Sequence, residues 1–343
     1  MIQATDEDMA EAVREAAALL AVGEVVAVPT ETVYGLAADA FDAEAVARVF
    51  EVKERPSFDP LIVHVASRKE LGRVAEVPGD VAGTVEKLIG EFWPGPLTLV
   101  LPKRPELPEI VTSGLPTVAV RQSANPIFRA IGKALGGPIA APSANRFGRI
   151  SPTSASATEA ELAGRISLIV DGGACREGLE STIVAVEAGE RRPQLRVLRA
   201  GPVTREQLQK FGKVVKGRRV TDHPEAPGQL ESHYAPRTPL MLFERIEEFR
   251  PEPGKRYGLL SYRGEGKRSW VGKHDWAEIE VLSPGSGKLA EAAVRLFYAM
   301  RRLDEAGLDG IVVEPVSEVG LGVAIMDRLR RAAAKRPETE TKN

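Results

Sequence analysis

Short apolar runs and helical patterns alternate over the first two hundred residues of the chain. Apolar positions spaced three and four apart over residues 9–20 predict a helix that Gly23 ends, and residues 25–29 read as a buried strand. Further strands are predicted at residues 61–65, 97–101, 118–120, 168–170 and 183–186, with helices at 43–52 and 81–92. This alternation predicts a mixed α/β domain over residues 1–205, and prolines near several strand ends argue against a purely parallel sheet.

A second pattern of the same kind begins after Pro239. Residues 289–303 have the apolar spacing of an amphipathic helix, and residues 323–334 have it again. Strand-like runs lie at residues 240–243, 257–261, 279–282 and 310–313. We therefore predict a smaller, Rossmann-like α/β domain over residues 239–343.

The stretch between the two patterns, residues 206–238, is polar and then rich in proline. Four prolines within residues 224–239 exclude a continuous helix or a central strand. From the residues alone, the simplest interpretation of this stretch is an exposed linker.

Length and charge limit the classes of function. A chain of 343 residues is too long for one ordinary core, which agrees with two domains. It has 46 basic and 48 acidic residues, so a phosphate-binding site must come from a local cluster of cations. The first residues lack the features of a signal peptide, and no apolar run reaches the ~18 to 20 residues of a membrane helix. The sequence therefore predicts a cytoplasmic protein with no membrane partner.

Several common catalytic motifs are absent from the sequence. Cys175 is the single cysteine, which excludes an intrachain disulfide and a multi-cysteine zinc site. The four histidines lack ligand spacing, so we predict no metal-ligating residues. There is no Walker A motif, no GxGxxG after a strand, no GxSxG elbow and no HExxH.

Six segments share one form, in which a strand end meets a loop rich in Ser, Thr, Gly, Pro, Lys or Arg. They are residues 29–39 (PTETVYGLAAD), 53–61 (KERPSFDPL), 117–121 (TVAVR), 141–153 (APSANRFGRISPT), 171–184 (DGGACREGLESTIV) and 198–204 (LRAGPVT). Together they supply cations and hydroxyls without a clear general base or nucleophile, which favours phosphoryl or nucleotidyl transfer. Alternatives stay open for single segments: the first also suits a capped strand-to-helix connection, and Lys53 and Arg55 also suit a helix C-terminus.

Taken together, the six segments closely resemble the threonylcarbamoyl-AMP synthase family. The sequences SHYAPRTPL (232–240), LFYAMRRLDEAG (296–307) and GLGVAIMDRLRRAA (320–333) resemble its longer, two-domain branch. The resemblance implies a YrdC-type catalytic domain, an open twisted mixed sheet with helices around a large basic cavity. It also implies that residues 206–238 fold back over the active site as a lid, which replaces the interpretation of an exposed linker.

The same resemblance implies an activity. The chain is expected to form L-threonylcarbamoyladenylate and pyrophosphate from L-threonine, bicarbonate or CO₂, and ATP with Mg²⁺. The product is then expected to pass to a separate complex that modifies adenosine next to the anticodon, in tRNAs reading codons that begin with A. One alternative is an RNA-binding module with the same basic cavity. Weak binding of RNA is therefore also expected of this chain. Two others are a HypF-type carbamoyltransferase, whose zinc-binding cysteine pairs are missing here, and a hydrolase of misformed adenylates.

Individual residues of this chain take roles from the resemblance. It implies that Lys53 and Arg55 are catalytic. The positions that match L-threonine contacts are Thr32, His64, Arg121, Ala141 and Ser181. The positions that match ATP contacts are Arg55, Asp59, Thr117, Ser143, Ser151, Arg199 and Tyr234. The chain departs from the family pattern at Asp59, where relatives often carry Asn, and at residues 190–194, which look like a small insertion before Arg199.

Overall fold

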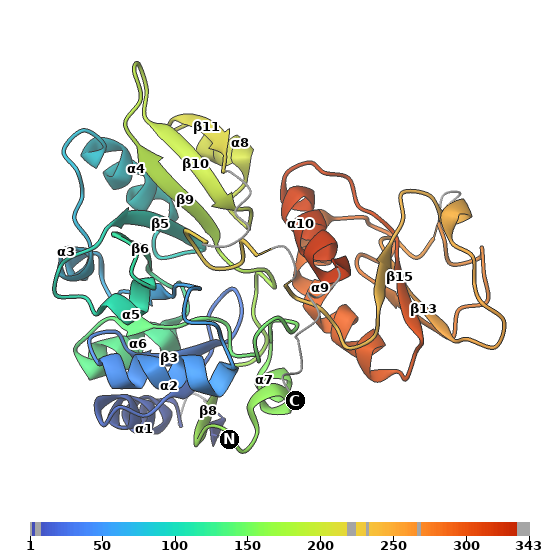
Figure 1. Ribbon diagram of the computed structural model, residues 1–343, viewed down its shortest axis with the longest axis horizontal. Helices are drawn as coiled ribbons and strands as arrows, with labels where there is room; N and C mark the ends of the chain where they lie inside the picture. The colour runs from blue at the N-terminus through green and yellow to red at the C-terminus, as the bar shows by residue number, and fades with distance from the viewer. Residues whose placement is uncertain (1, 4–7, 218–223, 231–232, 266–268, 335–343) are drawn as a thin grey trace, which may run out of the picture. The chain divides into compact units, whose positions relative to one another are not determined.

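The computed structural model describes residues 2–3, 8–217, 224–230, 233–265 and 269–334 (Figure 1). The chain forms two compact units, the first made of Met1–Phe147 and Ser151–Gln229 and the second of Gly148–Ile150 and Leu230–Asn343. The short loop Gly148–Ile150 thus groups with the second unit, although the chain on both sides of it belongs to the first. The predicted roles of residues 1–205, 206–238 and 239–343 stay predictions. Within the described residues, no helix is long and apolar enough to cross a membrane.

A mixed sheet of eleven strands runs through the described part of the first unit, in the order β1-β8-β2-β3-β7-β4-β6-β5-β9-β10-β11. The strands are β1 Ile2–Gln3, β2 Val26–Val28, β3 Gly35–Asp39, β4 Ile62–His64, β5 Leu97–Pro102, β6 Thr117–Arg121, β7 Ile139–Ala140, β8 Leu168–Asp171, β9 Thr182–Glu187, β10 Gln194–Arg199 and β11 Lys213–Lys216. β4 pairs with β6 in parallel, whereas β5 pairs with β6 antiparallel. The prediction of an α/β domain with a mixed sheet is therefore confirmed.

Eight helices accompany this sheet in the described residues. They are α1 Met9–Ala21, α2 Ala43–Lys53, α3 Leu71–Val74, α4 Ala82–Phe92, α5 Glu109–Thr112, α6 Pro126–Leu135, α7 Ala155–Leu162 and α8 Arg205–Leu208. Helix α2 shows why the chain turns where it does. The Asp42 side chain accepts the backbone N–H groups of Glu44 and Ala45, which caps the first turn. The helix ends at Glu54, whose φ of 55° lies in the left-handed region, so Lys53 and Arg55 flank a sharp reversal of the chain.

Alternation along the strands divides the apolar residues between the two faces of the sheet. On β4 and β6, Val63 and Val120 point to the face that carries the largest buried cluster, which also includes residues of α2 and α4. Ile62 and Ala119 point to the opposite face. Around β4, β5, β6, β9 and β10 the apolar cluster on this face is small and consists of Ile62, Val100, Ala119, Ile183, Ala185, Leu198 and Ala226, whereas residues of α1 and α6 cover another part of the face.

Ala226 covers this second face from the proline-rich stretch. It is fully buried, and its neighbour Glu225 forms an ion pair with Arg196 of β10, with 2.8 Å between the charged atoms. The carbonyl of Pro227 also accepts a hydrogen bond from Arg199 Nη1 at 3.4 Å. Residues 224–229 therefore lie on the sheet of the first unit, rather than being an exposed linker.

The second unit has a parallel four-stranded sheet in the order β12-β15-β13-β14. Its strands are β12 Leu240–Leu242, β13 Tyr257–Ser261, β14 Glu278–Val281 and β15 Gly310–Val313, and its long helices are α9 Leu289–Glu305 and α10 Leu321–Ala333. The apolar face predicted for residues 289–303 is largely buried, with Leu296, Met300 and Leu303 at its centre. The prediction of a smaller α/β domain with alternating strands and helices is confirmed.

Candidate active site

The second face of the first unit's sheet carries most of the predicted site residues on its strands. Because side chains alternate along a strand, Arg121 and Thr117 point to the same face as Ala119, and His64 points there with Ile62. Ser181 precedes β9 with the same parity as Ile183. Polar side chains thus line the face opposite the largest apolar cluster. Each buried polar side chain there needs a hydrogen-bond partner from the protein or from a ligand.

Arg121 and Thr32 meet on this face. Arg121, the last residue of β6, is buried, and its Nη1 donates to Thr32 Oγ1 at 3.0 Å. Thr32 is itself held by a turn in which Thr30 Oγ1 accepts the backbone N–H groups of Thr32 and Val33. Burial lowers the pKa of Arg121 from its ordinary value, and the nearby carboxylate of Glu31 opposes that shift. The guanidinium stays charged, because its ordinary pKa is far above neutrality.

His64 lies beside Arg121 in the parallel register of β4 and β6. Its ring packs on Phe128 with 4.7 Å between the ring centroids. Burial, and then the charge of Arg121, holds the pKa of His64 well below its usual range, while a contact with the backbone of Ala141 raises it. His64 is therefore a neutral imidazole at neutral pH. Ala141 lies next to β4, the strand that carries His64, because its N–H donates to the carbonyl of Ile62 at 2.9 Å.

Ser181 is shared between a hydroxyl and a guanidinium. Its Oγ lies 2.7 Å from Thr98 Oγ1 and accepts from Arg199 Nη2 at 3.0 Å. Arg199 Nε also donates to the carbonyl of Ser181 at 3.1 Å. Of the residues 190–194 that look like an insertion, 190–193 lie in the turn between β9 and β10 and Gln194 begins β10, and Arg199 still contacts Ser181 after them. Thr98 was not predicted, although a hydroxyl at an inward position of an apolar strand is a detectable signal.

Lys53, Arg55 and Asp59 form a buried charged group next to these residues. Arg55 Nη2 lies 2.9 Å from Asp59 Oδ2, and Arg55 also donates to the carbonyls of Asp59 and Pro60. Burial raises the pKa of Asp59, whereas Arg55, Lys53 and Arg199 all lower it, so three cations act on one carboxylate. The structure thus brings Lys53, Arg55 and Arg199 together. Asp59 offsets part of their charge, and its predicted contact with ATP stays a prediction.

Lys53 holds a loop by its ammonium group. Nζ donates to the carbonyl of Ser143 at 2.5 Å and also to that of Asn145, and the carbonyl of Lys53 accepts from the N–H of Phe147. Burial, and then Arg55, lowers the pKa of Lys53 well below its ordinary value. Lys53 therefore positions residues 143–147, a role that the sequence did not suggest.

Ser151 lies at the far end of the same loop. Its Oγ donates to Glu180 Oε1 at 2.6 Å, and both side chains are buried. Gly201 keeps this region tight, because a Cβ there would lie 2.5 Å from the carbonyl oxygen of Glu180 and 2.5 Å from the backbone nitrogen of Thr182. Glu180 was missed from the sequence, since the contact joins residues 29 apart.

Tyr234 belongs to the second unit and is described there. It is buried with a φ of 63°, stacks on Phe297 of α9 with centroids 5.6 Å apart, and lies under the Arg328 guanidinium at 5.2 Å. The next residue, Ala235, donates its N–H to the carbonyl of Gly148 at 2.8 Å. The role of Tyr234 in ATP binding stays a prediction, as do the ligand roles of all the other predicted site residues.

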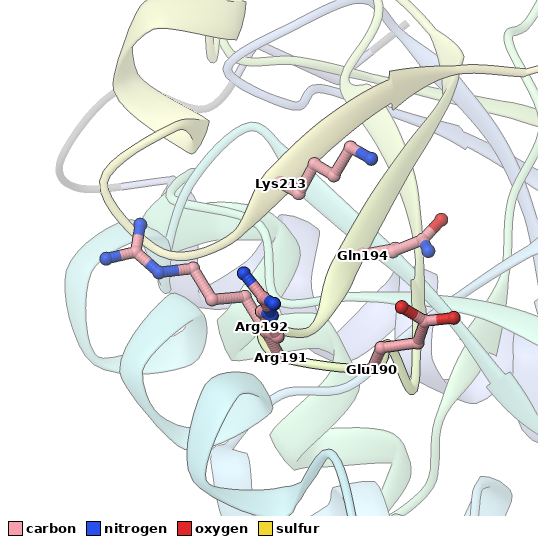
Figure 2. Close-up of a pocket in the computed structure, with 5 residues that line it drawn as sticks. All are labelled: Glu190, Arg191, Arg192, Gln194 and Lys213. Atoms are coloured by element: carbon pink, nitrogen blue, oxygen red, sulfur yellow. The ribbon is translucent and has the colours of Figure 1, made fainter.

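A hollow of about 610 Å³ lies elsewhere, at the β9–β10 turn (Figure 2). Figure 2 shows its lining side chains, which are Glu190, Arg191, Arg192, Gln194 and Lys213. None of the predicted site residues lines it. It is therefore distinct from the cluster around Arg121, Ser181 and Asp59.

The comparisons with known proteins agree with this arrangement. Residues 18–201 match the family described as "Telomere recombination" (Sua5_yciO_yrdC), and residues 203–334 match the "Threonylcarbamoyl-AMP synthase, C-terminal domain". The threonylcarbamoyl-AMP synthase of Pyrococcus abyssi is 41% identical over 342 residues, which cover 94% of each chain. The one from Bacillus subtilis is 39% identical over 338 residues, which cover 94% of this chain and 93% of the relative.

A solved structure extends the match to three dimensions. The crystal structure of P. abyssi Sua5 complexed with L-threonine has a TM-score of 0.82 and 40% identity, with 94% of each chain covered. A substituted variant of P. abyssi Sua5 gives a TM-score of 0.84 at 37% identity, covering 97% of this chain and 95% of that one. The fold and the buried polar face define a two-domain α/β enzyme. The chain belongs to the threonylcarbamoyl-AMP synthase family.

Proposed function

We propose that this chain joins L-threonine, bicarbonate or CO₂, and ATP into L-threonylcarbamoyladenylate, with release of pyrophosphate. The observation that carries the proposal is the presence of two buried polar groups on the first unit. Arg121 with Thr32 offers a cation and a hydroxyl to an amino acid, and Lys53, Arg55 and Arg199 offer cations to phosphates. Transfer of a nucleotidyl group depends mainly on such positioning and charge neutralisation.

The reaction needs two bond-forming steps. First, the threonine ammonium and bicarbonate combine to a carbamate, with loss of water and one proton. A carbamate oxygen then bonds to the α-phosphorus of ATP, and the bond from that phosphorus to pyrophosphate breaks. Arg121 would hold the threonine carboxylate as a bidentate partner, with Thr32 and Ser181 orienting the amino acid. Holding the two reactants in line contributes about 7 to 11 kcal/mol in well-oriented cases.

Arg55 and Arg199 would neutralise the phosphates of ATP. Arg55 is buried and paired with the carboxylate of Asp59, so its charge is shielded from water. Ser143 and Ser151 flank the loop that Lys53 holds, which suits hydroxyl contacts to the nucleotide. Magnesium would enter with ATP as part of the substrate. When bound to ATP, it would withdraw negative charge from the phosphates.

We assign residues 206–238 the role of a lid. The burial of Ala226 and the contact of Pro227 with Arg199 support this role, because they lay residues 224–229 over the polar face. Prolines reduce the entropy lost on closing, and a closed lid would protect a carbamate that reverts readily to amine and CO₂. Release to a separate tRNA-modifying complex would follow its opening.

Pyrophosphate release from ATP tests the proposal. The assay is run with threonine and bicarbonate each present or omitted, and the product is identified by mass. Release that needs both, with threonylcarbamoyl-AMP as product, is the expected result. Release indifferent to threonine would overturn the proposal, and saturable RNA binding without ATP turnover would favour an RNA-binding module instead.

A further inference from the structure

Glu31 is a buried carboxylate with one oxygen unused. It lies between Thr30 and Thr32 on the loop after β2, and its side chain is 1% exposed. Its Oε2 accepts a hydrogen bond from Ser123 Oγ. Its Oε1 has no hydrogen-bond partner among the residues that the structure describes, and lies 3.6 Å from Arg121 Nη1, too far for a good hydrogen bond.

Arg121 has a matching unused donor. Its Nη1 donates to Thr32, whereas its Nε has no hydrogen-bond partner within the described part of the chain. A buried acceptor without a hydrogen bond thus lies on the carboxylate next to the guanidinium that carries a buried donor without one. Leaving a buried charged group without its hydrogen bonds is costly, so such a pair is more stable with a ligand that satisfies both.

Ser123 fixes the direction of the Glu31 carboxylate. The Ser123 hydroxyl also accepts the N–H of Asn125 at 3.1 Å, just before α6 begins, so it is itself held in place. Because Oε2 is tied to Ser123, Oε1 is the oxygen left for another group. The nearby Cys175 does not add a second negative charge beside Glu31. Burial, and then Glu31, raises the pKa of Cys175 to about 12, so it stays a neutral thiol. Burial, and then Glu31, also raises the pKa of Glu177.

The chemistry of this pair matches an α-amino acid. Such a zwitterion has a carboxylate that accepts from a guanidinium and, on the next carbon, an ammonium that donates to a carboxylate. We propose that Glu31 Oε1 accepts a hydrogen bond from the α-amino group of L-threonine, whose carboxylate Arg121 holds. The inference rests on the proposed function and deepens it, because Glu31 then fixes the nitrogen that must meet CO₂. Glu31 also selects substrates that carry an α-amine.

Binding measurements on Glu31→Gln test this role without requiring turnover. The substitution keeps the shape of the side chain and removes its charge. We expect the Kd for L-threonine to rise about 10- to 100-fold and the Kd for ATP to stay within twofold, by titration calorimetry. The matched control is Glu177→Gln, which removes a neighbouring carboxylate and is expected to leave both affinities unchanged.

A ligand without the amine separates binding from a merely structural role. (R)-3-hydroxybutanoate keeps the carboxylate and the β-hydroxyl of L-threonine and lacks its α-amine. If Glu31 binds the amine, Glu31→Gln weakens threonine but does not weaken (R)-3-hydroxybutanoate, measured as a competitor. If Glu31 only neutralises Arg121, L-threonine and (R)-3-hydroxybutanoate both bind Glu31→Gln as tightly as they bind the wild type, or more tightly. That result would overturn the inference.

Two further outcomes keep the test decisive. Should Glu31→Gln unfold, Glu31→Asp retains the charge on a shorter side chain, and an unchanged threonine Kd in that folded variant would contradict the inference. The proposed function fails separately, since a wild-type chain that binds threonine through Glu31 but releases no pyrophosphate would refute the synthase reaction alone. A wild-type chain that binds no threonine would refute both.

Discussion

Arg55 and Asp59 form an ion pair in which Arg55 Nη2 lies 2.9 Å from Asp59 Oδ2 and the side chains are 3% and 0% exposed. One turn of chain, stiffened by Pro56, separates the two residues. A carboxylate in a predicted triphosphate site repels its ligand, yet a buried arginine without one is expensive. Asp59 therefore stabilises the buried arginine, and if Arg55 binds ATP as predicted, Asp59 competes with ATP for it.

Replacing Asp59 by Asn separates these two effects. We expect Asp59→Asn to bind ATP about 3- to 10-fold more tightly, because the competing charge is gone. We also expect it to lose about 1 to 3 kcal/mol of stability without ATP, because Arg55 loses an ionic partner. Calorimetric titration and urea unfolding measure the two quantities. Weaker ATP binding together with unchanged stability would show that Asp59 is a direct ATP ligand instead.

Replacing Arg121 by Lys tests the carboxylate partner of threonine. Lysine keeps the charge beside Glu31 but cannot form the planar, two-bond contact of a guanidinium. We expect the KM for threonine to rise about 10- to 100-fold and the KM for ATP to change less than twofold. Steady-state pyrophosphate release measures both, with Arg191→Lys on the β9–β10 turn as the control. An unchanged KM for threonine would remove Arg121 from the assignment.

Much of the fold follows from the apolar pattern. Each strand predicted from residue 61 to residue 186 exists, because alternation and apolar runs record which positions are buried. The order of those strands was not predictable, since β7, a strand of two residues, pairs with both β3 and β4. Pairing over such distances depends on the whole core, and two residues carry no periodic signal.

The site shows the same limit. The hydroxyl and cation loops were visible as composition, but Thr98 with Ser181 and Ser151 with Glu180 join residues 83 and 29 positions apart. Glu31 lies inside the segment 29–39, but no role was predicted for it. The orientation of its carboxylate depends on a hydrogen bond from Ser123, 92 positions away. The resemblance implied a catalytic role for Lys53, and nothing in the sequence indicated that its ammonium group holds the carbonyls of residues 143 and 145.

Choice between threonine and serine rests on one methyl group. A fitted apolar contact of that size discriminates by ~1 to 3 kcal/mol, or about 10- to 200-fold in kcat/KM. The neutral ring of His64 packed on Phe128 offers an apolar wall beside Arg121. We expect detectable but weaker turnover of L-serine, measured as pyrophosphate release, and weak turnover of L-allothreonine, whose methyl group points elsewhere. Equal kcat/KM for threonine and serine would exclude a fitted methyl pocket.

His64 predicts a dependence of stability on pH. Burial, and then Arg121, keeps its pKa well below 6.5, so the native state stays neutral while the unfolded chain takes up a proton as pH falls through 6.5. The free energy of unfolding must then decrease as the pH drops below 6.5. This group contributes up to about 1.4 kcal/mol per pH unit to that decrease. We expect His64→Asn to have a smaller loss than wild type between pH 7.5 and 5.5 in urea unfolding. The two proteins should run parallel above pH 7.5, and parallel curves below it would contradict the assignment.

Arg301 holds a loop that leads directly into a predicted ATP contact. Its Nη2 donates to the carbonyl of Ile150 at 3.0 Å, and Ile150 directly precedes Ser151, a predicted ATP contact. Ala235 holds Gly148 of the same loop, so residues of the second unit hold Gly148–Ile150 at two points within that unit. We expect Arg301→Ala to raise the KM for ATP about 3- to 10-fold and to leave the KM for threonine unchanged, because a charged hydrogen bond to the loop is lost.

The neighbouring Arg302→Ala is the matched control for Arg301→Ala. Arg302 pairs with Glu280 at 3.5 Å through a side chain that is itself 54% exposed, and such solvent-exposed pairs contribute ~0 to 1 kcal/mol. Steady-state kinetics with each substrate varied, together with thermal unfolding of both variants, separates a local effect from lost stability. A raised KM for ATP in Arg301→Ala alone, at an unchanged melting temperature, would mean that the hydrogen bond of Arg301 to the Ile150 carbonyl positions the neighbouring Ser151. Equal effects of the two substitutions would mean that this hydrogen bond has no specific role.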